Sequence, residues 1–177
     1  LERARTYIFS DQFLHFELED DLSEEDSPSR WSQMEEKTRQ IGIQVANDHL
    51  TLNALLPDLV SIYGSRLHAF GKGLASGWEN KEELWKMLYE QLKKTQPEKR
   101  VIHILLGFLA SCADSDRKTY NSILDSLVND DLLGEWFPIL QTSSILDEQG
   151  VDRLCEAASK NKAKTHNFIY LGLGGVH

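Results

Sequence analysis

The stretch NKEELWKMLYEQLKKTQPEKR, residues 80–100, contains one helix and the start of another. Asn80 followed three residues later by Glu83 is a capping box, in which each side chain bonds to a backbone N–H of the first turn. The mainly apolar run ELWKMLYEQL follows, and Pro97 begins the next helix because a first-turn residue needs no N–H. This succession predicts an all-α chain.

The same pattern extends in both directions from this stretch. Ser27 and Pro28 are a cap and a first-turn proline, and they predict a helix from about Pro28 to about Asn47. Towards the C-terminus, further capped starts occur at Ser115 or Asp116, at Asp130, at Asp147 and at Asn161. No strand alternation follows residue 27, so every element after it is expected to be helical.

The expected helices are about 12–18 residues long with breaks of about 2–5 residues, as in antiparallel helix pairs. Capped starts near Asn80, Ser115 and Asp147 recur at intervals of 35 and 32 residues. The chain from about residue 50 onward resembles a HEAT-like α-solenoid. Within it, Trp136-Phe137-Pro138 resembles the part of such repeats in which a proline is often found in the first helix. The resemblance implies a short right-handed stack that serves as an interaction or scaffolding module, often beside nucleotide-hydrolysing or effector domains of bacterial proteins. An irregular helical bundle explains the same helix lengths.

The glycine-rich stretch YGSRLHAFGKGLASG, residues 63–77, does not match a phosphate-binding loop, because the glycine spacing is wrong and no strand precedes it. An apolar stripe predicts an uninterrupted helix through it: Leu59, Tyr63, Leu67, Phe70 and Leu74. Gly64, His68, Gly71 and Ala75 share one line on this helix, so Gly71 is expected to allow close approach of another helix. Gly77 is expected to end the helix in the left-handed conformation.

The formal charge of −9 is concentrated in ELEDDLSEED, residues 17–26, which carries seven acids and no base. We therefore expect an N-terminal segment with an acidic linker over 1–27 and a helical domain over 28–177. The acidic run is either a solvated linker or an arm that docks on a basic face. Because the chain begins at Leu1 without a methionine or a signal pattern, it is expected to be a piece of a larger protein.

The sequence shows no catalytic, metal or cofactor motif. Asp114-Ser-Asp116 resembles the start of a calcium loop, but Lys118 and Thr119 stand where a ligand and a glycine belong, so helix capping is expected instead. Cys112 and Cys155 are expected to be reduced thiols on apolar helix faces, which indicates a cytoplasmic protein. A cysteine-dependent enzyme is the remaining catalytic alternative.

Two basic clusters form the candidate binding edge: Lys93, Lys94, Lys99 and Arg100 near Pro97, and Lys160, Lys162 and Lys164 near Asn161. In a helix-pair array every second break lies on the same edge, so both clusters are expected there, with the acidic break 129–131 between them. Ordinary solvated helix ends are the alternative explanation, because lysine is favoured in the last turn of a helix. We expect a partner protein or a neighbouring domain, no cofactor and no membrane, with a nucleic-acid backbone as the alternative ligand.

Overall fold

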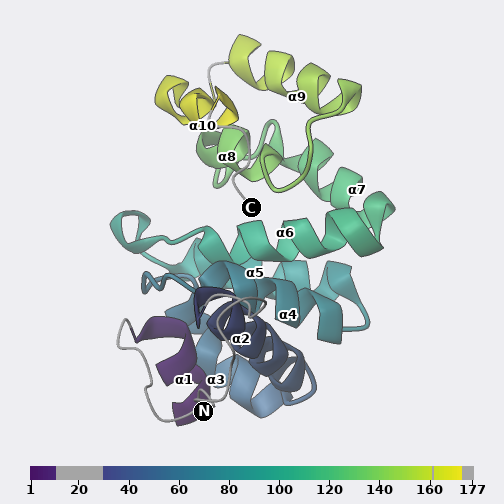
Figure 1. The fold of residues 1–177 in the computed structure, drawn as a ribbon. Coiled ribbons are helices and arrows are strands. Elements are labelled where there is room, and N and C mark those ends of the chain that lie inside the picture. Colours follow the sequence, from purple (N-terminus) through teal and green to yellow (C-terminus); the bar gives the residue numbers. More distant parts are fainter. Residues whose placement is uncertain (11–29, 161, 173–177) are drawn as a thin grey trace. The chain divides into compact units, whose positions relative to one another are not determined.

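A computed structural model describes residues 1–10, 30–160 and 162–172, and the prediction of an all-α fold is confirmed over this part of the chain (Figure 1). Its regular elements there are α-helices and short 3₁₀ helices, without a strand. The chain divides into two compact units, unit 1 from Leu1 to Phe108 and unit 2 from Leu109 to His177.

The described part of unit 1 contains six α-helices, the last of which continues into unit 2. They are α1 (Glu2–Phe9), α2 (Arg30–Ala46), α3 (His49–Leu59), α4 (Leu67–Gly77), α5 (Lys81–Lys94) and α6 (His103–Ser115), with the 3₁₀ helix η1 (Pro97–Lys99) before α6. The predicted helix over about 28–47 is confirmed as α2. The core is mainly leucine and aromatic, and it includes Tyr7, Leu55, Phe70, Leu88 and Phe108.

Helix α4 contacts α2 through a reciprocal pair of glycines. A Cβ built on Gly73 would lie 2.0 Å from the carbonyl oxygen of Arg39, and one built on Gly42 would lie 2.5 Å from that of Phe70. Each added Cβ would also lie 3.0 Å from the Cα of the other glycine. The two backbones therefore touch where any larger residue would hold them apart.

A second glycine pair joins α4 to α6. A Cβ on Gly71 would meet the carbonyl oxygen of Ile104 at 2.4 Å, and one on Gly107 would meet that of His68 at 1.9 Å. The prediction that Gly71 allows close helix approach is confirmed. Helix α4 is thus closely packed along two sides, which the single line of small residues did not indicate.

The prediction of an uninterrupted helix through the glycine-rich stretch is wrong. The helix is interrupted: α3 ends at Leu59, a loop covers 60–66, and α4 begins at Leu67. The loop carries the buried Arg66, which donates to the carbonyl oxygens of Tyr7 and Ser10 at the end of α1. Apolar periodicity cannot detect this long-range contact.

Gly77 is the last residue of α4, and its φ is not in the left-handed region. It is small for a different reason, because an added Cβ would lie 2.8 Å from the Cβ of Ala46 and 2.9 Å from Ile43 on α2. The predicted helix end at Gly77 is therefore confirmed, but the predicted left-handed conformation is wrong, and Gly77 serves packing against α2.

The capping of α5 is confirmed, since the side chain of Asn80 accepts a hydrogen bond of 3.1 Å from the N–H of Glu83. The expected helix start at Pro97 is wrong, because Pro97 opens only η1 and α6 begins at His103. Between them the N–H of Val101 donates to the carbonyl oxygen of Val60 at 2.9 Å, which holds this segment extended against the loop after α3.

Unit 2 contains the end of α6 and shorter elements after it. They are α7 (Arg117–Leu127), η2 (Gly134–Trp136), α8 (Phe137–Gln141), α9 (Glu148–Ser159), η3 (Thr165–Phe168) and α10 (Ile169–Gly172). Asp116 and Asp147 cap α7 and α9 as predicted, with bonds of 3.1 Å from Thr119 N–H and 2.8 Å from Gly150 N–H.

The helix expected to start at Asp130 is not regular. Asp130 caps a turn by accepting from the N–H groups of Leu132 and Leu133, and the only α-helix in this stretch is the five-residue α8. Pro138 lies in the first turn of α8, because proline lacks the N–H and clashes with the carbonyl four residues earlier in a longer helix.

Candidate interaction surface

The first basic cluster of the candidate edge lies in unit 1. Lys93 and Lys94 are exposed in the last turn of α5, and Lys99 is exposed in η1. Arg100 donates from Nε to the carbonyl oxygens of Leu92, at 3.2 Å, and Thr95, at 3.0 Å. Its cation thus serves the C-terminus of α5, where the helix dipole favours positive charge.

The second cluster lies in unit 2, and each of its lysines is bonded to a carboxylate of the same unit. Lys160 Nζ is 2.5 Å from Glu156 Oε1, Lys162 pairs with Asp131, and Lys164 pairs with Glu135. The bond from Lys162 lowers the pKa of Asp131, and the bond from Lys160 lowers that of Glu156. An acidic ligand would therefore compete with the chain's own carboxylates at all three lysines.

The two clusters belong to different units, and the acidic run 17–26 that was expected to act with them lies outside the described residues. The acidic break at 129–131 does take part, since Asp131 is the partner of Lys162. Exposed pairs of this kind contribute only about 0–1 kcal/mol each, because solvent screens them.

The cysteines differ in a way that the apolar pattern did not predict. Cys112 is buried as expected, but the expectation that Cys155 lies on a buried apolar face is wrong, because Cys155 is exposed. Helix α9 turns another side inward, which carries Leu154, Ala157 and the buried Arg153. Arg153 Nε donates to Asp125 Oδ1 at 2.7 Å, so a polar residue occupies a core position that periodicity assigns to apolar ones.

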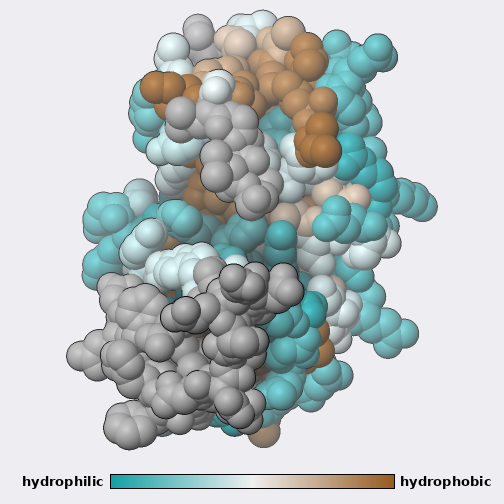
Figure 2. All heavy atoms as spheres, viewed as in Figure 1, coloured by the Kyte–Doolittle hydropathy of each residue, from teal (hydrophilic) through white to brown (hydrophobic). Residues whose placement is uncertain are grey.

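An apolar surface on unit 2 follows from this orientation of α9. Ile145 is 91% exposed in the loop before α9, Leu146 in the same loop is 43% exposed, and Val151 in the first turns of α9 is 46% exposed. Figure 2 shows hydrophobic surface over α9 and this loop. Single exposed apolar residues are common on protein surfaces, whereas several large apolar side chains exposed side by side are typical of a binding surface.

The exposed side of α9 is divided into an apolar and an acidic row. Val151, Cys155 and Ala158 are spaced by four and three residues, so they lie within roughly 60° of one another around the helix. Together with Ile145 and Leu146 they form what we call the apolar stripe, and all of its members are exposed. Buried Leu154 flanks the stripe on one side.

The acidic row flanks the stripe on its other side and consists of Glu148, Asp152 and Glu156, spaced by four residues. All three are exposed. Glu156 is bonded to Lys160 and Asn129, whereas Glu148 and Asp152 have no ion-pair partner within the described residues. Like charges at this spacing repel one another along a helix.

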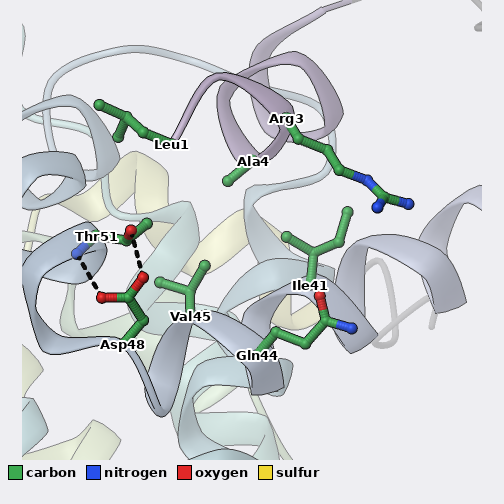
Figure 3. A pocket seen from close by; sticks show the side chains of 8 residues that line it. All are labelled: Leu1, Arg3, Ala4, Ile41, Gln44, Val45, Asp48 and Thr51. Carbon is green, nitrogen blue, oxygen red and sulfur yellow. Dashed lines mark hydrogen bonds between the residues drawn. The ribbon is translucent and has the colours of Figure 1, made fainter.

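Unit 1 contains a shallow cavity of about 180 Å³ between α1, α2 and the start of α3 (Figure 3). Its apolar lining comes from Leu1, which directly precedes α1, from Ala4 of α1, and from Ile41 and Val45 of α2. Arg3, Gln44, Asp48 and Thr51 complete the lining. The carboxylate of Asp48 accepts bonds from the N–H of Thr51, at 3.1 Å, and from its hydroxyl, at 2.7 Å, which lowers the pKa of Asp48. Asp48 and Thr51 are thus already engaged in capping α3.

Over the described part of the chain, no three His, Cys, Asp or Glu side chains gather as metal ligands would. No described helix is both long and apolar enough to cross a bilayer. The chain matches no protein-family model, no curated protein and no solved structure.

Proposed function

We propose that this chain is a helical interaction module, which holds another protein or a neighbouring domain of a longer chain on the apolar stripe of unit 2. The observation that carries the proposal is the exposure of Ile145, Leu146 and Val151 on and beside a helix whose other face is already packed. The hydrophobic effect disfavours leaving such a surface in water, and burial against a partner removes that cost.

A HEAT-like solenoid architecture is part of the proposal, and it accounts for the exposed apolar stripe on the side of α9 that is not packed in unit 2. In stacked helical repeats each helix pair buries one side against the preceding pair and the other against the next. Capped helices of 11 and 12 residues in unit 2, α7 and α9, fit the size of such units. The stripe then corresponds to the side on which another repeat or a partner is placed.

Photocrosslinking from Cys155 tests this function, because Cys155 is the exposed thiol within the stripe and Cys112 is buried. A benzophenone maleimide attached to Cys155 should give discrete adducts in an extract of the source cells. The matched control is Gln149→Cys combined with Cys155→Ser, which places the same label on an exposed position of the same helix, roughly 160° from Val151.

Substitution of Ile145 and Val151 by serine should abolish the adducts from Cys155, because it removes apolar contact area without adding charge. Equal adducts from Cys155 and from the Gln149→Cys control, or adducts that persist in the serine variant, would contradict the proposed function. Circular dichroism of the serine variant controls for folding, since both replaced side chains are exposed.

A nucleic-acid-binding module is the second candidate, and the exposed lysines Lys93, Lys94 and Lys99 favour it. Neutralising the acids of residues 17–26 should then strengthen binding to heparin, with an affinity that falls steeply as salt rises. Substitution is preferable to deletion of the N-terminus, because α1 buries Tyr7 and Ile8 in unit 1. Unchanged elution from heparin would show that the acidic run is only a solvated linker, and this candidate would lose its best support.

A further inference from the structure

The charges around the apolar stripe define the chemistry of its partner. In unit 2 five basic residues are already engaged in ion pairs, namely Arg117, Arg153, Lys160, Lys162 and Lys164. Beside the stripe, Glu148 and Asp152 have no such partner among the described residues, and they stand one turn apart. The surface next to the apolar contact is therefore negative.

We infer that the partner is a basic amphipathic helix. Its apolar face covers Ile145, Leu146 and Val151, and its lysine or arginine side chains lie opposite Glu148 and Asp152. This inference rests on the proposed function, since it specifies what the stripe binds. A helix fits the geometry because residues at i, i+4 and i+7 on α9 form a ridge that packs into the groove between the side chains of a second helix.

The same charges argue against three other occupants. A second copy of the chain would bring one acidic row against another, and residues 109–177 hold ten acidic against six basic residues, a formal charge of −4. The chain's own acidic run 17–26 would meet the same repulsion. An anionic lipid surface is repelled as well.

A pair of synthetic peptides tests the inference directly. Each has about 14 residues, with leucines on one face, and the flanking positions are lysine in the first peptide and glutamate in the second. Binding to the full chain is measured by fluorescence anisotropy, and coverage of the stripe is measured by the rate at which iodoacetamide alkylates Cys155. We expect the lysine peptide to bind and to slow alkylation at least about five-fold, and the glutamate peptide to do neither.

The acidic row is tested with Glu148→Gln combined with Asp152→Asn. Because each exposed pair contributes at most about a five-fold change in affinity, we expect the lysine peptide to bind about five- to ten-fold more weakly to this variant. The charge-matched control is Asp114→Asn combined with Glu98→Gln, two exposed residues that belong neither to α9 nor to the loop before it, and it should leave the affinity unchanged.

The outcomes separate this inference from the proposed function. Equal binding and equal Cys155 protection by both peptides would overturn the basic partner while leaving the stripe as an interaction surface. Failure of both peptides would overturn the inference, and crosslinking from Cys155 would then decide the function independently. Protection of Cys155 that depends on the concentration of the chain alone, with a dimer in sedimentation, would assign the stripe to a second copy and overturn the inference.

Discussion

Substitution of Gly73 by alanine tests the packing on which unit 1 depends. The added Cβ would lie 2.0 Å from the carbonyl oxygen of Arg39, and ordinary contacts of this kind begin near 3.4 Å. Helices α2 and α4 must therefore separate by about 1.4 Å along this line, which is 3.4 minus 2.0. The obstacle is backbone, so no side-chain rotation can relieve it.

The separation should cost more than the helix gains from alanine. A gap of 0.5–1 Å already removes about a quarter to a half of the dispersion energy of each affected contact. Overpacking of this kind typically costs about 1–3 kcal/mol, and Gly73→Ala should fall at the upper end. The intrinsic preference of alanine for a helix returns only about 0.5–1 kcal/mol.

Gly42→Ala offers an internal comparison, because its Cβ would lie 2.5 Å from the carbonyl oxygen of Phe70, which requires a shift of about 0.9 Å. It should destabilise less than Gly73→Ala. The double variant should lose less than the sum of the two, because the first alanine has already moved the helices apart. Coupling of about 0.5–3 kcal/mol is expected for residues in contact.

Urea denaturation followed by far-UV circular dichroism measures these differences in the free energy of unfolding. Gly134→Ala is the matched control, because the nearest atom to its added Cβ is an ordinary 3.5 Å away. If Gly73→Ala is neutral or more stable than the parent, or if the two alanines add without coupling, the close glycine contact does not hold α2 and α4 together.

Three shorter predictions follow from single groups. The pKa of Glu36 is lowered from 4.5 to about 2, chiefly by the hydrogen bonds from Arg39. The Glu36–Arg39 pair therefore stabilises the fold above pH 4.5, and this stabilisation is lost as the pH falls towards about 2. Glu36→Gln should lower the free energy of unfolding at neutral pH by at most about 1 kcal/mol, because the site is exposed. Acid denaturation titrations should show that this difference from the parent disappears at low pH. Asp125→Ala should destabilise unit 2 by about 1–3 kcal/mol in urea, because it leaves the buried Arg153 without its carboxylate; an unchanged midpoint would refute this. Mass spectrometry of the folded chain after brief iodoacetamide treatment should find one modified cysteine, Cys155, and two modified thiols would contradict the burial of the other.

Helix caps were predictable from the sequence because they are local. Asn80, Asp116 and Asp147 each bond to an N–H three residues later, so the interaction is encoded within four consecutive residues. The failed helix after Asp130 has a local cause, Pro138 in the first turn of α8, whereas the break between α3 and α4 involves a long-range contact. The loop 60–66 carries Arg66, which donates to the carbonyl oxygens of Tyr7 and Ser10, 59 and 56 residues earlier in the chain.

The candidate surface was only partly predictable for the same reason. An apolar pattern identifies which residues of α9 prefer burial, but it cannot decide which side faces the core when a buried Arg153 replaces an apolar residue there. The ion pair with Asp125 makes that burial favourable, and Asp125 lies on another helix. A sequence signal for the stripe did exist, namely Ile145-Leu146 directly before the cap Asp147, where two large apolar residues occupy a loop.

Charge has to be judged after pairing rather than by counting lysines. Lys160, Lys162 and Lys164 suggest a site for an acidic ligand when the sequence is taken alone, yet Glu156, Asp131 and Glu135 lie against them. These contacts are exposed and individually weak, but they leave unit 2 with few uncommitted cations. The uncommitted charges beside its apolar stripe are carboxylates, so the partner that gains most from this surface carries the opposite sign.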